Sequence, residues 1–359
     1  MLRLRLSSLT LPGLSSLPNH SNVFLKLENL QPSGSFKSRG IGKLLVARLA
    51  AVESGIKING TAATSRAHFY SSSGGNAGLG CVHAAVALGC SATVVVPLST
   101  TEYMVNKICA AGATSVIRQG ASWQEADNHL TQVVMPEARS RGETAIYVHP
   151  FDDVEIWNGN AGIVKETVLQ IREAERHYPV ATASLLDDDY GSNSEVKSVD
   201  IDAIVCSVGG GGLFCGIMQG LDELGMNKTH VVAMETLGAD SLDQSVKQGK
   251  LVTLPAITSI ATSLGARTVC AKALEYALRD TVSTVVLSDA EAIEACRRFA
   301  NEERFLVEPA CSVCPAICYD GRLKKLLPNL TLESNVVLVI CGGSNVSFDI
   351  LEKYLGQGS

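Results

Sequence analysis

The run Ala203-Ile204-Val205-Cys206-Ser207-Val208-Gly209-Gly210-Gly211-Gly212-Leu213 joins an apolar strand to a glycine loop. A continuous apolar run of this kind is typical of a parallel strand that is buried on both faces. Four glycines ahead of a helix let backbone N–H groups surround a phosphate without interference from Cβ atoms. No Gly-Lys-Ser/Thr follows and G-x-G-x-x-G does not match, which argues against a nucleoside triphosphate loop and a dinucleotide fold. The run predicts an α/β fold that binds a single phosphate, although tight packing without a ligand also explains four glycines.

Strands and helices alternate along much of the remaining chain. Strands are predicted over 23–28, 68–70, 92–97, 113–117, 146–149, 231–235, 285–287 and 336–340. Helices are predicted over 35–53, 78–88, 101–111, 122–138, 157–175 and 288–303. Ser288 and Glu291 form a predicted capping box at the start of the last helix. This rhythm indicates parallel strands with helices on both sides of the sheet.

The composition restricts the class of protein. The chain has 359 residues, of which 46% are hydrophobic, and this length corresponds to roughly two domains. The net charge is −6 and no block of Lys or Arg exceeds two residues, which makes nucleic acid an improbable partner. No apolar run approaches the roughly 20 residues of a membrane span. The sequence therefore predicts an enzyme-sized α/β protein without nucleic-acid or membrane partners.

The cysteines, the N-terminus and one polar segment have plain interpretations. The eleven cysteines are scattered and odd in number, which fits free thiols in a reducing compartment better than disulfides. Cys311-x-x-Cys314-x-x-x-Cys318 has the spacing of one helix face and lacks the partners of a zinc site. Met1 to Asn22 contains no acidic residue and weakly resembles a mitochondrial presequence, and the polar segment Leu185 to Ser198 is interpreted as a surface insertion.

A lysine among small residues is the candidate catalytic group. Pro32-Ser33-Gly34-Ser35-Phe36-Lys37 follows the first strand, and Ser35 is the predicted N-cap of the next helix. Lys37 then lies in the first helical turn, where the positive end of the dipole lowers the pKa of its amine. A neutral amine can attack a carbonyl and form a Schiff base. A solvated surface loop is the alternative interpretation of this stretch.

Two other strand ends open onto small residues. Ser71-Ser72-Ser73-Gly74-Gly75-Asn76-Ala77-Gly78 precedes a helix and offers free N–H groups to an anion. Cys341-Gly342-Gly343-Ser344-Asn345 follows the last long strand. Ligands of open parallel sheets collect at such carboxyl ends. The two segments are therefore expected to line the same site as the glycine loop.

The four motifs, taken in this order, resemble those of pyridoxal-phosphate (PLP) enzymes of fold type II, the tryptophan-synthase-β class. The resemblance is greatest to L-serine/L-threonine dehydratases and extends from about Val23 to near the C-terminus. It implies an α/β architecture of two open, mostly parallel twisted sheets flanked by helices. It also implies a small α/β domain over 35–147, and a large PLP-binding domain made of 1–34 and 148–359.

The same resemblance implies roles for individual residues. Lys37 would hold the cofactor in a Schiff base, and Phe36 would lie against one face of its ring. Asn76 would hydrogen-bond its phenolic oxygen, and Cys341 would face its pyridine nitrogen. Its phosphate would be bound by Gly209, Gly210, Gly211, Gly212 and the amide of Leu213. The substrate carboxylate would be bound by Ser72, Ser73, Gly74, Gly75, Asn76 and Ala77.

A monovalent cation such as K⁺ would also follow from the resemblance. The matching ligand positions are Glu235, Ala239, Ser241 and Leu264, and a Gly-Ala turn after a strand explains them equally well. Dimerisation of identical chains and a cytoplasmic location, with the mitochondrion as the other possibility, are further expectations. Because little sequence follows Asn345, a degradative rather than a feedback-regulated enzyme is expected.

The implied reaction is β-elimination of water from L-serine or L-threonine, which gives ammonia with pyruvate or 2-oxobutanoate. A thiol at Cys341 cannot keep the pyridine nitrogen protonated as a carboxylate would, and this favours elimination over transamination. A serine racemase of the same fold is the alternative, but related racemases carry Ser at the position of Gly74. A β-replacement enzyme and a PLP-binding protein without turnover are further alternatives. The sequence does not rank serine against threonine, because one methyl group is worth only about 1–3 kcal/mol.

Overall fold

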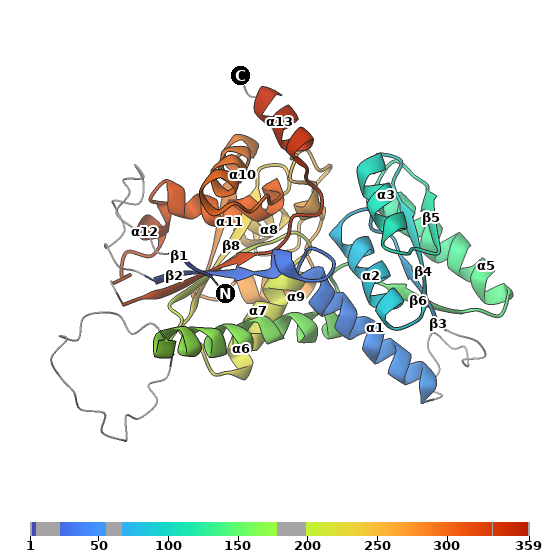
Figure 1. Ribbon diagram of the computed structural model, residues 1–359, viewed down its shortest axis with the longest axis horizontal. Helices are drawn as coiled ribbons and strands as arrows, with labels where there is room; N and C mark the ends of the chain where they lie inside the picture. The colour runs from blue at the N-terminus through green and yellow to red at the C-terminus, as the bar shows by residue number, and fades with distance from the viewer. Residues whose placement is uncertain (1, 5–21, 55–66, 178–198, 332, 358–359) are drawn as a thin grey trace.

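The computed structural model describes residues 2–4, 22–54, 67–177, 199–331 and 333–357 (Figure 1). Most of the presequence-like N-terminus and the whole segment Leu185 to Ser198 lie outside these ranges, so the interpretations of both remain predictions. The described residues form two separate sheets, each with helices on both sides (Figure 1). This arrangement confirms the predicted α/β class with two mostly parallel sheets.

The larger sheet has six strands, and all but one of its strand pairs are parallel. In spatial order the strands are β1 (Leu2–Leu4), β2 (Asn22–Leu27), β10 (Asn335–Ile340), β7 (Ala203–Ser207), β8 (His230–Thr236) and β9 (Val282–Leu287). β1 pairs with β2 in the antiparallel sense at one edge. Every residue of β7 and β10 is buried, as expected for central parallel strands.

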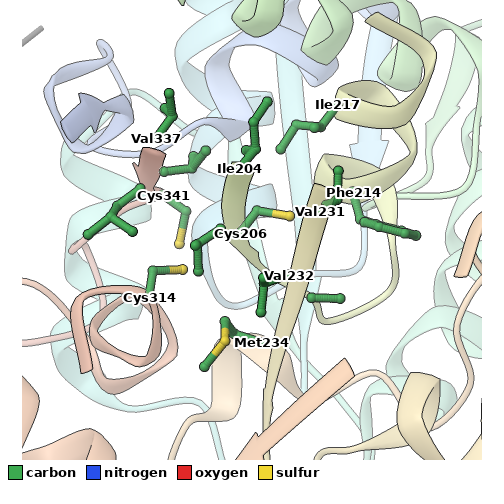
Figure 2. Packing of buried hydrophobic residues seen from close by; sticks show 14 of the residues in the cluster. Ile204, Cys206, Phe214, Ile217, Val231, Val232, Met234, Cys314, Val337 and Cys341 are labelled. Atoms are coloured by element: carbon green, nitrogen blue, oxygen red, sulfur yellow. The ribbon is translucent and has the colours of Figure 1, made fainter. Parts of the chain in front are cut away.

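Helices cover both faces of the larger sheet. Figure 1 shows α6 and α7 on one side of the strands and α10 and α11 on the other. The helices of this part are α6 (Val154–His177), α7 (Gly212–Glu223), α8 (Ser241–Gln248), α9 (Ala271–Ala277), α10 (Asp289–Glu303), α11 (Pro309–Tyr319), α12 (Arg322–Leu326) and α13 (Phe348–Gln357), with short 3-10 turns η2 (Glu28–Leu30) and η4 (Thr262–Leu264). Between the layers, Ile204, Val232 and Val337 pack with sulfur-containing side chains (Figure 2).

The smaller sheet has four parallel strands. In spatial order they are β5 (Ser115–Arg118), β4 (Ser91–Val96), β3 (Ala67–Ser71) and β6 (Thr144–Val148). The helices around it are α1 (Lys37–Glu53), α2 (Asn76–Ala87), α3 (Glu102–Ala110), α4 (Trp123–His129) and α5 (Met135–Ser140), with the π turn η3 (Leu130–Val134) between the last two. The loops that leave β3 and β7 each run directly into the next helix, α2 and α7.

Several boundaries differ from the predictions. Ser35 is not the N-cap of α1, because it pairs with Gly342 in an isolated bridge and the helix begins at Lys37 after Phe36. The predicted helix over 122–138 continues to Ser140 and is interrupted by the π turn η3. The capping box of Ser288 and Glu291 is confirmed. Cys311, Cys314 and Cys318 lie on α11, as predicted, and all three are buried.

The described residues contain neither a candidate membrane helix nor a candidate metal cluster. None of their helices combines the length and the apolar character that crossing a membrane requires. In the same parts of the chain, no three Asp, Glu, His or Cys side chains come together in a way that could hold a metal ion. The three cysteines of α11 belong to the core cluster of the larger sheet, and Figure 2 shows Cys314 close to Cys206 and Cys341.

Candidate active site

Backbone contacts join the lysine motif to the segment after β10. The N–H of Phe36 donates to the carbonyl oxygen of Cys341 over 2.9 Å, next to the bridge between Ser35 and Gly342. The hydroxyl of Ser344 donates to the carbonyl oxygen of Ser33 over 3.0 Å. Two motifs that lie about 300 residues apart in sequence thus form one wall of the site, with Lys37 at its end.

The amine of Lys37 is held inside the protein. Its Nζ donates to the carbonyl oxygen of Pro150 over 2.5 Å and lies 5.0 Å from the centre of the Phe36 ring. Burial of this amine lowers its pKa from 10.5 to about 8, against a smaller opposing effect of Cys341. The lowered pKa agrees with the predicted direction, but its main cause is desolvation, not the helix dipole. A substantial fraction of the amine is therefore neutral near physiological pH and can act as a nucleophile or a base.

The glycine loop after β7 is tightly packed. A Cβ atom at Gly210 would lie 2.2 Å from Cγ of Phe151, and one at Gly212 would lie 2.8 Å from the carbonyl oxygen of Phe151. Gly211 has a φ of +99°, which side-chain-bearing residues rarely adopt, and a Cβ there would lie 2.6 Å from Cβ of Ala273. At Gly209 a Cβ would approach Cα of Leu264 to 3.1 Å. Packing alone thus requires glycine at several of these positions.

The same loop also presents free donors. In the described ranges, the backbone N–H groups of Gly210, Gly211, Gly212 and Leu213 donate no hydrogen bond. They lie at the start of α7, where the helix dipole adds positive potential. Converging N–H groups at a helix start form a binding site for a phosphate or another anion.

The loop after β3 is held by side chains. The hydroxyl of Ser72 is fully buried and donates to Oδ1 of Asp127 over 2.6 Å. Ser73 is less buried, and its Oγ accepts from the N–H of Gly75 over 3.3 Å. A Cβ atom at Gly74 would lie 2.4 Å from Oγ1 of Thr100, so a residue larger than glycine would displace that side chain.

Asn76 and Ala77 begin α2, and Asn76 contacts a buried acid. Its Nδ2 donates to Oε1 of Glu308 over 2.7 Å, and the N–H of Asn345 donates to the other oxygen of Glu308 over 3.2 Å. In the described parts of the chain, Oδ1 of Asn76 is buried and has no hydrogen-bond partner. An unpaired buried acceptor is costly, so this atom indicates a place for a further polar group.

Glu308 is a site residue that the four sequence motifs do not contain. It is 3% exposed at the start of α11, and burial raises the pKa of its carboxyl group. The available sequence signal was an acid directly after the apolar residue Val307 and before Pro309, which is typical of a helix start. Pro150 and Phe151 were missed for a different reason, since they act through a carbonyl group and through packing.

Cys341 lies at the end of β10, opposite the end of β7. Its Sγ is 3.2 Å from Oγ of Ser207, and the side chain is 5% exposed. Figure 2 shows the sulfur atoms of Cys341, Cys314 and Cys206 in one apolar region. No carboxylate takes part in this hydrogen bond, so the partner that these residues offer to a ring nitrogen is a thiol or a hydroxyl.

The predicted cation ligands are near one another around α8. Glu235 accepts hydrogen bonds from the N–H groups of Leu242 and Asp243, over 2.9 and 2.8 Å, and burial raises its pKa to about 8. Ser241 donates to the carbonyl oxygen of Ala266 over 3.0 Å. Ala239 and Leu264 share a small buried cluster. Capping of α8 therefore accounts for the position of Glu235 without a cation.

Known proteins of one enzyme family resemble this chain over most of its length. The family described as "Pyridoxal-phosphate dependent enzyme" matches residues 6–342. An L-serine dehydratase of Saccharomyces cerevisiae is 40% identical, over 93% of this chain and 91% of its own. An L-serine dehydratase/L-threonine deaminase of Bos taurus is 38% identical, over 94% and 91%. The crystal structure of a fungal L-serine ammonia-lyase from Rhizomucor miehei superposes with a TM-score of 0.78 at 32% identity, and the match covers 94% of this chain and 93% of the other.

The family match, the two sheets and the order of the motifs are mutually consistent. The lysine with a lowered pKa, the loop of free amides and the thiol at the end of β10 all come from the matched residues. The chain belongs to the family of pyridoxal-phosphate dependent enzymes.

Proposed function

We propose that this chain eliminates water from L-serine, and from L-threonine, to release ammonia with pyruvate or 2-oxobutanoate. The observation that carries the proposal is the buried amine of Lys37, with a pKa of about 8, in a chain that shares 40% identity with an L-serine dehydratase over 93% of its length. An amine that is partly neutral at physiological pH can both form a Schiff base and remove a proton from the carbon next to a carboxylate.

The residues present fit pyridoxal phosphate. The unpaired amides of the glycine loop match its phosphate, and the unpaired Oδ1 of Asn76 matches a polar group at its ring. Phe36 would lie against the ring, and Cys341 with Ser207 would meet its nitrogen. When bound, the cofactor supplies an aldehyde for Lys37 and an electron sink for the reacting carbon.

Different groups of the chain would then have different roles in the reaction. The amine of Lys37 takes the α-proton of the substrate, since desolvation keeps part of it neutral. The loop Ser73 to Ala77 orients the substrate carboxylate through its amides and the hydroxyl of Ser73. Cys341 would offer the ring nitrogen a thiol rather than a carboxylate, which would favour loss of the hydroxyl over transfer of the amino group.

The racemase alternative needs an acid or base on the second face of the substrate. At the position where related racemases carry Ser, this chain has Gly74, and the space that its Cβ would take is occupied by the side chain of Thr100. One-face elimination is therefore favoured. Formation of substantial D-serine during incubation with L-serine would reverse this preference, and a different product in the presence of sulfide would favour β-replacement.

Other properties follow as part of the same proposal. A monovalent cation near Glu235, Ala239, Ser241 and Leu264 would offset the burial of the Glu235 carboxylate. The chain would divide into a small domain over 35–147 and a large domain of 1–34 and 148–359, and two chains would form a homodimer. A cytoplasmic location fits the cysteines of the described residues, all of which are free thiols.

The test is to purify the protein with pyridoxal phosphate and to measure 2-oxo acid formed from L-serine and L-threonine. Lys37→Ala should lose activity at least about 1,000-fold, because the amine is both the attachment point and the base. Borohydride reduction followed by peptide mapping should place the cofactor on Lys37. An unmodified Lys37, or a visible cofactor band without 2-oxo acid formation, would contradict the proposal.

A further inference from the structure

Asp127 connects two strands of the smaller sheet to α4. Its Oδ1 accepts from the hydroxyl of Ser72 and from the hydroxyl of Tyr147, each over 2.6 Å. Ser72 directly follows β3 and Tyr147 belongs to β6, and the two strands pair in parallel with Tyr70 opposite Tyr147. Burial and the bond to Asp127 raise the pKa of Tyr147, so its phenol stays protonated and remains a donor.

The contacts of Ser72 leave it no proton for a ligand. A serine hydroxyl has one hydrogen, and Ser72 gives it to Asp127. A substrate carboxylate can only accept hydrogen bonds, so Ser72 cannot serve Asp127 and the substrate together. Ser73 differs, since its Oγ accepts from the N–H of Gly75 and its own proton remains available. The adjacent serines are therefore suited to different tasks.

The helix that carries Asp127 also contacts the segment that holds Lys37. Trp123, one turn earlier on α4, lies with its ring 6.4 Å from the ring of Phe151 and 6.3 Å from that of His149. Between these two residues, Pro150 accepts the hydrogen bond of the Lys37 amine. One face of α4 thus supports the loop after β3 and the segment 149–151.

We propose that Asp127 is a positioning residue that fixes the loop Ser72 to Gly75 through Ser72, so that Ser73 and the following amides meet the substrate carboxylate. The inference deepens the proposed function and rests on it for the identity of the substrate. The short bond from Ser72 to the Asp127 carboxylate holds the start of the loop, because hydrogen bonds to charged groups are stronger than neutral ones. The bond from Tyr147 ties the same carboxylate to β6. Without them the buried hydroxyl of Ser72 and the partly buried hydroxyl of Tyr147 lose their acceptor, and the loop loses its fixed position.

The experiment measures amino-acid binding without turnover. Glycine has no β-hydroxyl and cannot undergo elimination, and glycinamide lacks the carboxylate. Calorimetry on the holoenzyme should show that Asp127→Ala weakens glycine binding about tenfold, the equivalent of one charge-assisted hydrogen bond. Glycinamide binding should change less than about twofold by the same reasoning. For L-serine, KM should rise in the same proportion as the glycine Kd while kcat changes less.

Two variants and one control make the result specific. Asp127→Asn keeps an acceptor oxygen and should recover part of the glycine affinity, and Tyr147→Phe should have a smaller effect because the bond to Ser72 remains. Glu137→Ala removes the same charge from an exposed position of α5 and should leave both ligands unaffected.

Unchanged glycine binding in Asp127→Ala would overturn the proposal, and so would an equal loss of glycine and glycinamide. The calorimetric measurement does not depend on catalysis. A wild-type protein that binds glycine but forms no 2-oxo acid would therefore refute the proposed function and leave this test of Asp127 valid.

Discussion

The loops after β7 and β3 both connect a parallel strand to a helix, but different forces hold them. The β7 loop is fixed by volume, because Phe151, Leu264 and Ala273 occupy the space of any Cβ atom. The β3 loop is fixed at its two ends by hydrogen bonds, from Ser72 to Asp127 and from Asn76 to Glu308. A loop held by volume keeps its amides in place without polar side chains, whereas a loop held by hydrogen bonds depends on individual acceptors.

This difference suits two kinds of ligand. A phosphate that stays bound needs rigid donors, and a packed glycine loop provides them from its backbone without polar side chains. A substrate carboxylate arrives and leaves in every turnover, and the β3 loop, which is proposed to meet it, is fixed by a hydroxyl and an amide side chain. The two loops should therefore respond differently to substitution. The β7 loop is sensitive to size along its glycines, whereas the β3 loop is sensitive to size at Gly74 and to polarity at Ser72 and Asn76.

The largest effect is expected from added volume in the β7 loop. Gly210→Ala places a methyl group 2.2 Å from Cγ of Phe151, so the loop or the ring must move. Overpacking costs about 1–3 kcal/mol, and affinity for pyridoxal phosphate should fall about 10- to 100-fold. Equilibrium binding followed by cofactor fluorescence measures this loss.

Gly162→Ala in α6 is the matched control, because a Cβ there has no neighbour within 4 Å. It should leave cofactor affinity unchanged and raise the free energy of unfolding by about 0.5–1 kcal/mol, the usual gain for Ala over Gly in a helix. Equal cofactor binding by Gly210→Ala and wild type would show that volume does not hold the β7 loop.

A smaller effect should follow from removing an acceptor beside the β3 loop. Glu308→Ala leaves Nδ2 of Asn76 buried without its partner at 2.7 Å, which costs about 1–3 kcal/mol. Cofactor affinity and kcat/KM for L-serine should each fall about tenfold, whereas Glu308→Gln, which keeps the shape and one acceptor, should lose less. Equal losses in the two variants would indicate that the charge of Glu308 matters more than its hydrogen bond.

The smallest effect is expected from pH, which changes the neutral fraction of the Lys37 amine that lies between the two loops. With a pKa of about 8, the neutral fraction of Lys37 rises about tenfold between pH 7 and 9, whereas a pKa of 10.5 would give a rise of about 100-fold. The rate at which the apoprotein captures pyridoxal phosphate should follow the tenfold course, as stopped-flow absorbance can measure. Lys37→Ala provides the background rate at other lysines.

Through proton linkage, the same lowered pKa of Lys37 determines how the stability of the apoprotein changes with pH. The folded chain releases the Lys37 proton near pH 8 and the unfolded chain near 10.5, so the unfolded state binds more protons between these values. The free energy of unfolding of the apoprotein should therefore increase with pH across this window, relative to Lys37→Ala. A flat difference between the two proteins would show that the amine is solvated.

Much of the fold could be predicted because its signals are local. The apolar runs of β7 and β10 require only that neighbouring residues be buried, and the capping box of Ser288 and Glu291 spans four residues. Ser35 shows where local reasoning fails. It has a good N-cap side chain, but pairing with Gly342, which follows β10, determined its conformation instead.

For the candidate site, the sequence by itself determined the lysine, the glycine loop and the small residues at the strand ends, because each is a short motif whose chemistry follows from adjacent residues. Only the tertiary structure supplied Pro150 as the acceptor for Lys37, Glu308 as the partner of Asn76 and Asp127 as the acceptor for Ser72. These three contacts join residues 113, 232 and 55 positions apart. No local pattern encodes such pairs, since they exist only when strands and helices from distant parts of the chain meet at one end of the sheets.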